Sequence, residues 1–251
     1  MDSEAQRQVE EESYPQSLYV PADCSGYLQA VDESALLAIA ARNDLLVILP
    51  HRPGDFVVSG ITLVSAKGKE EIDKGLAAQL KNAVIVGSQR SPEQDPEFAV
   101  RQLVEIAVRA LSPGVNDPYT AISCIDRLGS ALCLLCGREF PLPYRYDDQG
   151  RLRVVSKAVT FAGMLASAFD QIREYGRSSA AVTMRLMEAL EIIAVQIRDA
   201  EQRDAVQREG EMILRGGTET LVEKNDIEEL QLRYQGLIDI LDKKIPRHAS
   251  G

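Results

Sequence analysis

The most concentrated group of polar side chains in this chain lies in one short stretch, ALSPGVNDPYTAISCIDRL at 110–128. Several of them surround the predicted start of a helix, where unpaired backbone N–H groups can hold an anion. Loops carried by rigid helices are frequent positions for binding groups. The pattern predicts a small ligand site, whose candidate residues are Ser112, Asn116, Asp117, Thr120, Asp126 and Arg127.

The same stretch also has a purely structural interpretation. Pro113 and Gly114 can turn the chain, Asp117 can cap the following helix, and Pro118 fits its first turn. The stretch would then be a corner between two antiparallel helices. A corner alone and a corner with a ligand site both stay open from the sequence.

Two further groups could join such a site. Arg90 and Asp95 lie at the predicted junction from a strand to a helix, where the helix dipole and side chains can converge on a ligand. Arg173 and Arg177 lie near another predicted helix end. Their guanidinium groups could bind a carboxylate or a phosphate, or could cap the carbonyls of that helix.

Signatures of known enzyme classes are absent from the sequence, which contains no Walker loop, GxGxxG, GxSxG or HExxH. The two histidines, His51 and His248, argue against a multi-histidine metal site and against Ser-His-Asp chemistry. Cys133 and Cys136 form a CxxC inside an apolar helical segment and are predicted to be core thiols. We therefore predict no catalytic residue, no metal and no cofactor.

An enzymatic alternative stays open beside this prediction. Arg90, Arg127 and Arg177 could hold a small anionic substrate while Asp117 acts as a base. This alternative requires the four side chains to converge in one pocket.

Composition limits the class of protein and its partners. Hydrophobic residues make up 45% of the chain, which is enough for a true core. The net charge of -10 argues against nucleic acid as a partner, because phosphate backbones are repelled on average. The longest apolar runs are much shorter than the roughly 20 residues that span a bilayer, and the N-terminus lacks a secretion signal. We therefore expect the chain as given to be soluble.

Short strands separated by turns are predicted from residue 18 to residue 86, with a helix capped by Asp32 and another at 69–81. After Gly87 the pattern changes to long amphipathic helices, with a β-hairpin near 144–155. The expected helices are 96–111, 118–136, 157–175, one that starts at 178 or 179, and two at 201–214 and 226–243 that flank a break at 215–217.

These patterns predict an α+β fold, in which a small β-rich module precedes an antiparallel helical bundle with one β-hairpin insertion. The expected domains are a flexible acidic leader at 1–16, the β-rich module at 17–88, the helical domain at 89–244 and a disordered tail at 245–251.

Four stretches together carry a family resemblance: SGYLQAVDESALL, RPGDFVVSGITL, VIVGSQRSPEQDPEFAVRQLVEIAVRALSPGVNDPYTAISCIDRL and FDQIREYGRSS. The chain resembles the bacterial family of predicted membrane proteins called domain of unknown function twenty-two fifty-four. The resemblance implies that transmembrane helices precede this region in family members, and that this chain, without them, is either a soluble part of a membrane protein or a naturally shortened relative. It implies no established activity and no catalytic residues.

The β-rich module also resembles the half-motif of the barrel-sandwich folds in lipoyl and biotinyl domains. Under this likeness Gly54 and Gly60 serve backbone geometry. No lysine precedes Lys67, which excludes a covalently attached carrier cofactor on the module. The likeness implies a structural adaptor.

The function expected from the sequence is that of a soluble cytoplasmic domain of a bacterial membrane protein, on the cytoplasmic side of the inner membrane. We expect a homo-oligomer that senses an unidentified small molecule or ion, or that gates, through the corner at 112–127. The alternatives are the enzyme described above and a pure scaffold, in which Asn116 and Thr120 are buried in a contact between subunits.

Overall fold

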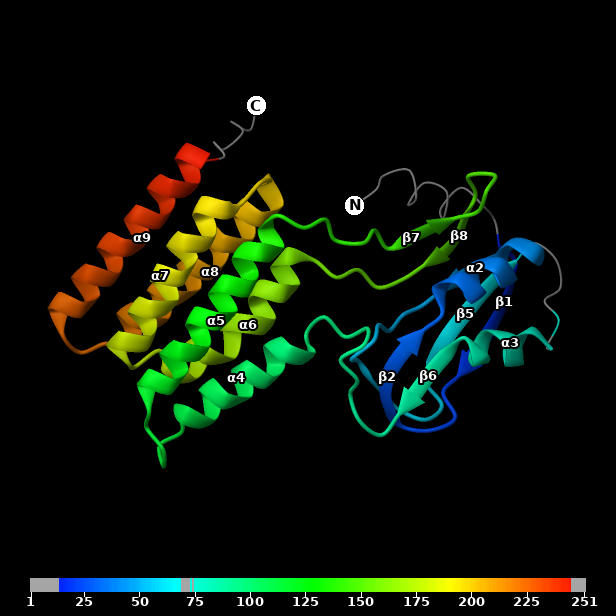
Figure 1. Ribbon diagram of the computed structural model, residues 1–251, viewed down its shortest axis with the longest axis horizontal. Coiled ribbons are helices and arrows are strands. Elements are labelled where there is room, and N and C mark those ends of the chain that lie inside the picture. The colour runs from blue at the N-terminus through cyan, green and yellow to red at the C-terminus, as the bar shows by residue number, and fades with distance from the viewer. Residues whose placement is uncertain (1–13, 69–72, 74, 245–251) are drawn as a thin grey trace. The chain divides into compact units, whose positions relative to one another are not determined.

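The computed structural model describes residues 14–68, 73 and 75–244 (Figure 1). Within these residues the fold is mixed α/β, with two sheets and eight helices, and most strands precede the helices. Two compact units form: the β unit, which contains the described residues up to Phe98 and Pro141–Ala158, and the helical unit, which contains Ala99–Phe140 and the described residues from Val159 onward. Most of the predicted leader and the whole predicted tail lie outside the described residues.

The β unit contains two sheets. The first has the strand order β1-β5-β3-β8-β7 and the second has the order β4-β2-β6. All neighbouring strands are antiparallel except β3 and β8, which are parallel. The strands are β1 Gln16–Pro21, β2 Gly26–Val31, β3 Leu45–Ile48, β4 Phe56–Val57, β5 Thr62–Gly68, β6 Val84–Gly87, β7 Tyr144–Tyr146 and β8 Leu152–Val155.

Two helices share the core of the β unit with both sheets. They are α2 Glu33–Arg42 and α3 Leu76–Asn82. Asp32 caps α2 as predicted, because its carboxylate accepts a hydrogen bond from the Ala35 N–H at 2.9 Å. Leu28, Leu36, Leu80 and other apolar side chains of strands and helices meet in one buried cluster. Because helices contribute to this core, the barrel-sandwich likeness stays a prediction.

The β-hairpin of β7 and β8 lies between helices in the sequence but completes the larger sheet of the β unit. Val154 aligns with Val47 in the parallel pair of β3 and β8, and the Leu49 N–H donates to the Val155 carbonyl at 2.8 Å. Val154 is fully buried there. The region 89–244, expected to be one helical domain, therefore contributes residues 141–158 to the β unit, where β8 gives β3 a hydrogen-bonded neighbour on its second edge.

The helical unit consists of two layers of helices. Its helices are α4 Phe98–Ala110, α5 Pro118–Cys136, α6 Phe161–Gly176, α7 Ala180–Gln196, α8 Ala200–Thr220 and α9 Lys224–Lys244. Contacts advance together along α5 and α7, from Asp126–Arg185 to Gly137–Arg198, so these two helices run in parallel. The same holds for α7 with α9 and for α6 with α8. Helices α5, α7 and α9 thus form one layer, and α6 and α8 belong to the other.

Helix α8 does not break where the sequence predicted. It continues through 215–217 to Thr220, and Leu221 is its C-cap. The sequence predicts a stop at this glycine pair, but Gly217 permits close packing instead. A Cβ at Gly217 would collide with Leu230 of α9 and lie 3.1 Å from Thr183 of α7. Glycine therefore lets three helices approach one another here.

Among the described helices, α5 is long and apolar enough, by length and composition only, to cross a membrane. One set of its apolar side chains, among them Ile125, Leu128 and Leu132, is buried in the core of the helical unit, whereas Leu134 is exposed. Core helices of globular proteins pass the same test.

Candidate functional site

The predicted corner between α4 and α5 is held by local hydrogen bonds. The Asn116 N–H donates to the Ser112 carbonyl at 2.9 Å, and the Asp117 N–H donates to the Ala110 carbonyl at 2.8 Å. The Ser112 hydroxyl donates to the Arg109 carbonyl at 2.7 Å. Asn116 has a φ of 48°, a left-handed conformation that asparagine tolerates better than most residues.

Asp117 caps α5, as the sequence predicted. Its carboxylate accepts hydrogen bonds from the Thr120 hydroxyl at 2.5 Å and from the Thr120 N–H at 3.1 Å. The bond from the hydroxyl, followed by those from backbone N–H groups, lowers the pKa of Asp117. A carboxylate with a lowered pKa is a weaker base, so this geometry suits a helix cap better than proton abstraction.

Asp126 and Arg127 lie further along α5 and do not bond to the corner. Asp126 accepts from Arg185 Nε of α7 at 2.5 Å, whereas Arg127 is exposed. Arg185 also pairs with Glu188, and Glu188 pairs with Arg233 of α9. Asp126 therefore begins a row of ion pairs that crosses the layer of α5, α7 and α9.

Arg173 and Arg177 lie on and just after the last turns of α6. Leu111 lies 3.5 Å from the position of a Cβ at Gly176, so this helix end is beside the corner. The arginine side chains bond elsewhere. Arg173 donates to Glu209 at 3.0 Å and to Asp170 at 2.9 Å, and Arg177 pairs with Glu174 at 3.7 Å.

Glu209 of α8 is a buried carboxyl that the sequence did not single out. Burial raises its pKa to about 7, because the opposing effect of Arg173 is smaller and Asp170 adds a second negative charge. The carboxyl therefore titrates near neutral pH inside the helical unit.

Arg90 and Asp95 do form a close pair in the β unit. Arg90 Nε donates to Asp95 Oδ2 at 2.7 Å. A second pair, between Arg52 and Glu97, and a third, between Lys157 and Asp55 at 2.9 Å, belong to the same segments. We call these six residues the ion-pair cluster: Arg52, Asp55, Arg90, Asp95, Glu97 and Lys157.

Two carboxylates of the ion-pair cluster are almost fully removed from water, since Asp95 is 5% exposed and Glu97 is 3% exposed. The Glu97 N–H donates to Asp95 Oδ1 at 3.0 Å, which links the two pairs. Burial acts to raise the pKa of Asp55, but the Lys157 ammonium and the Arg52 N–H outweigh it and hold the pKa below its usual value. Each carboxylate of the ion-pair cluster thus faces a cation.

Gly54 lies directly against the pair of Arg90 and Asp95. It has a φ of 93°, and a Cβ at this position would lie 2.6 Å from atoms of both side chains. Its N–H donates to the Leu28 carbonyl at 2.8 Å, and the Leu28 N–H donates to the Asp55 carbonyl at 2.9 Å. Glycine is required here both by the backbone conformation and by the close approach.

The segment 88–97, which we call the connector, leads from β6 to α4 and is tied to β2 by two glutamine side chains. Gln29 donates to the Gln89 carbonyl at 2.7 Å. Gln94 accepts from the Val31 N–H at 3.0 Å and donates to the Val31 carbonyl at 3.4 Å, as a neighbouring strand would. The connector is therefore fixed along the edge of β2.

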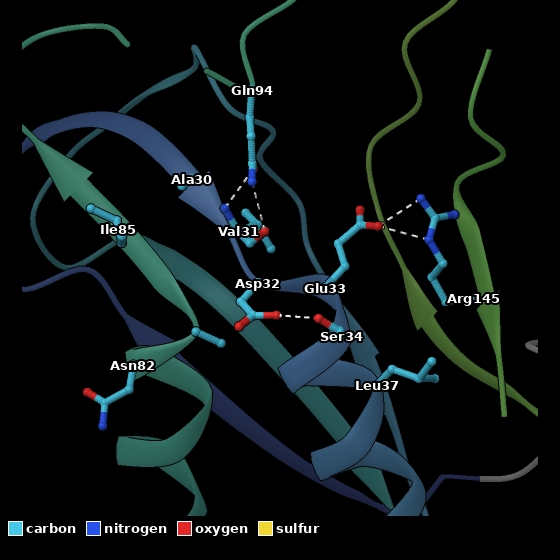
Figure 2. Close-up of a pocket in the computed structure, with 11 residues that line it drawn as sticks. Ala30, Val31, Asp32, Glu33, Ser34, Leu37, Asn82, Ile85, Gln94 and Arg145 are labelled. Carbon is cyan, nitrogen blue, oxygen red and sulfur yellow. Dashed lines mark hydrogen bonds and ion pairs between the residues drawn. The ribbon is translucent and has the colours of Figure 1, made fainter. Parts of the chain in front are cut away.

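Gln94 also lines an open groove of about 840 Å³ beside the start of α2 (Figure 2). The groove has an ion pair on another side, where Arg145 donates to Glu33 at 2.8 Å. Asp32 and Ser34 bond to each other at 2.7 Å. Figure 2 shows Gln94 and Arg145 directed at their partners on either side of the helix start.

The ion-pair cluster contains three acidic and three basic residues, so it holds no net charge. Its groups neutralise one another, which suits a structural tie better than an anion site or an acid–base pair. Among the described residues, no group of His, Cys, Asp or Glu could hold a metal ion. Burial raises the pKa of Cys136 to about 11, which makes that thiol unreactive near neutral pH.

Sequence reasoning found Arg90 and Asp95 but missed the rest of the ion-pair cluster. One local signal was present: in HRPGD, a glycine stands between an arginine and an aspartate. The partners of these residues lie 45 and 102 positions away, and no local pattern encodes such pairs.

Comparison with known proteins adds a family. The family described as Predicted membrane protein (DUF2254) matches residues 1–192. Uncharacterized proteins of Mycobacterium bovis and Mycobacterium tuberculosis are 34% identical to the chain over 230 residues, which is 88% of this chain and 44% of each relative. The chain thus spans less than half the length of these curated relatives. No solved structure matches the chain.

We predict that Gly54→Ala destabilises the β unit more than Gly60→Ala. Both glycines have positive φ, but nothing lies within 4 Å of a Cβ at Gly60. Gly60→Ala should therefore cost about 1 kcal/mol of backbone strain, whereas Gly54→Ala adds an overlap with Arg90 and Asp95 of about 1–3 kcal/mol. Urea unfolding checks the difference; equal losses in the two variants would show that the ion pair does not pack on Gly54.

We predict that Glu209 makes the helical unit less stable as the pH rises. The folded carboxyl has a pKa of about 7 against a reference of 4.5, so the folded state binds its proton more tightly. The resulting stability is complete below the reference value and is lost, by up to about 3 kcal/mol, as the pH rises through about 7.

Glu209→Gln should remove this pH dependence. The urea midpoint of the variant should therefore rise relative to that of the unmodified chain as the pH increases from about 5 to about 8. The matched control is Glu211→Gln, at an exposed carboxylate on the same helix. A parallel pH profile for the chain and Glu209→Gln would contradict the raised pKa.

Proposed function

The chain belongs to the family of predicted membrane proteins DUF2254, and we propose that it serves there as a water-exposed, non-enzymatic domain that senses or gates. On this proposal the domain lies on the cytoplasmic side of the membrane. The family resemblance expected from the sequence is confirmed. The cytoplasmic side, the sensing role and a homo-oligomer are proposals.

The greater length of the relatives supports a protein in which one part spans the membrane and another part, corresponding to this chain, lies in water. The chain corresponds to 44% of these relatives, which leaves more than half of their length for membrane segments. Among the described helices, the one that is long and apolar enough to span a bilayer, α5, contributes to the helical core. The cysteines are free, as expected in a reducing compartment.

The observation that carries the proposal is the fixed connector in front of α4. Two buried carboxylates, Asp95 and Glu97, are held by Arg90 and Arg52 immediately before Phe98, where α4 begins. Removing one partner of a buried ion pair costs about 3–5 kcal/mol, whereas an intact pair adds little to stability. Buried ion pairs suit a switch between two conformations of the connector. The intact pairs specify one conformation, and a ligand or contact that competes for either partner can release the connector from it.

Nothing in the described residues favours the enzymatic alternative over this proposal. Arg90 is paired inside the β unit and Arg177 pairs with Glu174. Asp117 caps a helix with a lowered pKa.

Exposed apolar side chains support the proposal of a homo-oligomer. Ile192 and Val195 of α7 lie on the surface of the helical unit. The scaffold alternative required burial of Asn116 and Thr120 between subunits. Asn116 is exposed and Thr120 is half-buried in the single chain.

We predict that the native protein sediments with the inner membrane and is digested by protease in inverted vesicles but not in intact spheroplasts. Immunoblotting with antibodies against the chain gives the readout. Digestion in intact spheroplasts alone would place the domain on the other side. A protein found wholly in the soluble fraction would contradict the proposed membrane role.

We predict that Arg52→Met releases the connector. The loss of this partner leaves Glu97 buried without its guanidinium and should cost about 3 kcal/mol. Hydrogen exchange should then accelerate in the connector and at the start of α4, while the exposed control Arg151→Met leaves it unchanged.

The double variant Arg52→Met, Glu97→Leu should recover most of the lost stability, because no buried charge is left unpaired. If Arg52→Met alters exchange only in the loop around Gly54, the ion pair does not hold the connector, and the coupling role fails.

A further inference from the structure

Three turns of the helical unit lie together at one end, which we call the turn end. They join α4 to α5, α6 to α7 and α8 to α9. The Thr220 hydroxyl donates to the Arg177 carbonyl at 2.6 Å, and Leu111 lies 3.5 Å from a Cβ position at Gly176. Figure 1 shows the turn between α4 and α5 and the turn between α8 and α9 at the same, lower end of this unit.

The turn end exposes large apolar or aromatic side chains from each of its turns. Val222 is 90% exposed and Tyr119 is 79% exposed, and Val115 and Tyr175 are each 58% exposed. Single exposed apolar side chains are ordinary on protein surfaces. Here four of them lie at three adjacent turns, and none of them belongs to the buried core of the unit.

The local structure explains how Val115 comes to project. The Val115 N–H donates to the Ser112 carbonyl at 3.0 Å, and Asn116 follows with a left-handed φ of 48°. Asp117 then closes the turn as the cap of α5. The corner that the sequence marked as a candidate site therefore displays an apolar side chain at its tip.

The turn end carries little net charge, although the chain carries a net charge of -10. Within 109–120, 174–179 and 215–226, the four basic residues are Arg109, Arg177, Arg215 and Lys224, and the five acidic residues are Asp117, Glu174, Glu219, Glu223 and Asp226. Most of the excess negative charge therefore lies elsewhere on the chain, and a lipid surface without net charge suits this end better than an anionic one.

These features match the chemistry of a lipid–water interface. Tyrosine is enriched there because its ring is apolar and its hydroxyl is polar. Short apolar tips on otherwise polar turns can enter the headgroup region, whereas a stable protein interface needs a contiguous, well-packed apolar centre. A lipid surface therefore fits the turn end better than a second copy of the chain.

We propose that the turn end docks on the surface of a zwitterionic bilayer and inserts Val115, Tyr119, Tyr175 and Val222 shallowly among the headgroups. This inference rests on the proposed function, in that the domain lies beside a membrane. It adds which surface of the helical unit contacts the lipid.

The test uses tryptophan as a reporter, because the chain contains none. Tyr119→Trp and Val222→Trp place one reporter each at the turn end of the whole chain. Leu134→Trp is the matched control, since Leu134 is 72% exposed near the opposite end of α5. Each variant is mixed with vesicles of phosphatidylcholine and phosphatidylethanolamine, with and without lipids that carry a quencher just below the headgroup.

The expected result is a shift of emission to shorter wavelength and quenching for Tyr119→Trp and Val222→Trp, with neither change for Leu134→Trp. The variant with serine at positions 115, 119, 175 and 222 should bind these vesicles at least about tenfold more weakly. Circular dichroism checks that each variant keeps its helical content.

Several outcomes would overturn the inference. One is an unchanged emission of the tryptophans at the turn end, and another is an equal change in Leu134→Trp. A third is a wavelength shift that grows with protein concentration in the absence of vesicles, which would indicate contact with a second copy of the chain. Failure of the proposed function remains distinguishable. A native protein in the membrane fraction with silent reporters removes only this inference, and a native protein in the soluble fraction removes the membrane role whatever the vesicles report.

Discussion

The pairing of arginine with carboxylate against Gly54 is the constraint on which the arrangement of the β unit depends. Asp95 and Glu97 are buried, so each requires a cation in contact, and Arg90 and Arg52 meet that requirement. The pair of Arg90 and Asp95 holds the connector internally, and the pair of Arg52 and Glu97 ties its end to the loop before Gly54, next to the residue at which α4 begins. Only a glycine permits this approach, because a Cβ would occupy the space of the ion pair.

In the helical unit, glycines also permit a close approach, here between apolar side chains and a neighbouring helix. Gly210 and Gly217 of α8 face Leu237 and Leu230 of α9, so these two helices approach closely at both positions. On the same helix the Glu209 carboxyl is buried against Arg173 of α6, and burial raises its pKa to about 7. Close packing thus places a titrating group where its protonation and the stability of the unit are linked.

Local signals in the sequence predicted much of the fold and less of the candidate site. The caps Asp32 and Asp117 were readable because a cap acts within three residues. The hairpin was also readable, but its parallel partner β3 was not, since Val154 and Val47 pair across a hundred positions. The glycines in α8 were misread as a break because their reason for being there, Leu230 and Thr183, belongs to other helices.

The return of the hairpin to the first sheet sets an order of events during translation. Residues up to Phe98 leave the ribosome first, yet β3 obtains its second neighbour only when β8 at Leu152–Val155 has been made. Helices α4 and α5 must therefore emerge while the earlier strands still lack a partner. The nascent chain consequently carries an open edge on β3 while about a hundred residues are synthesised, which takes roughly 5–20 s at bacterial rates.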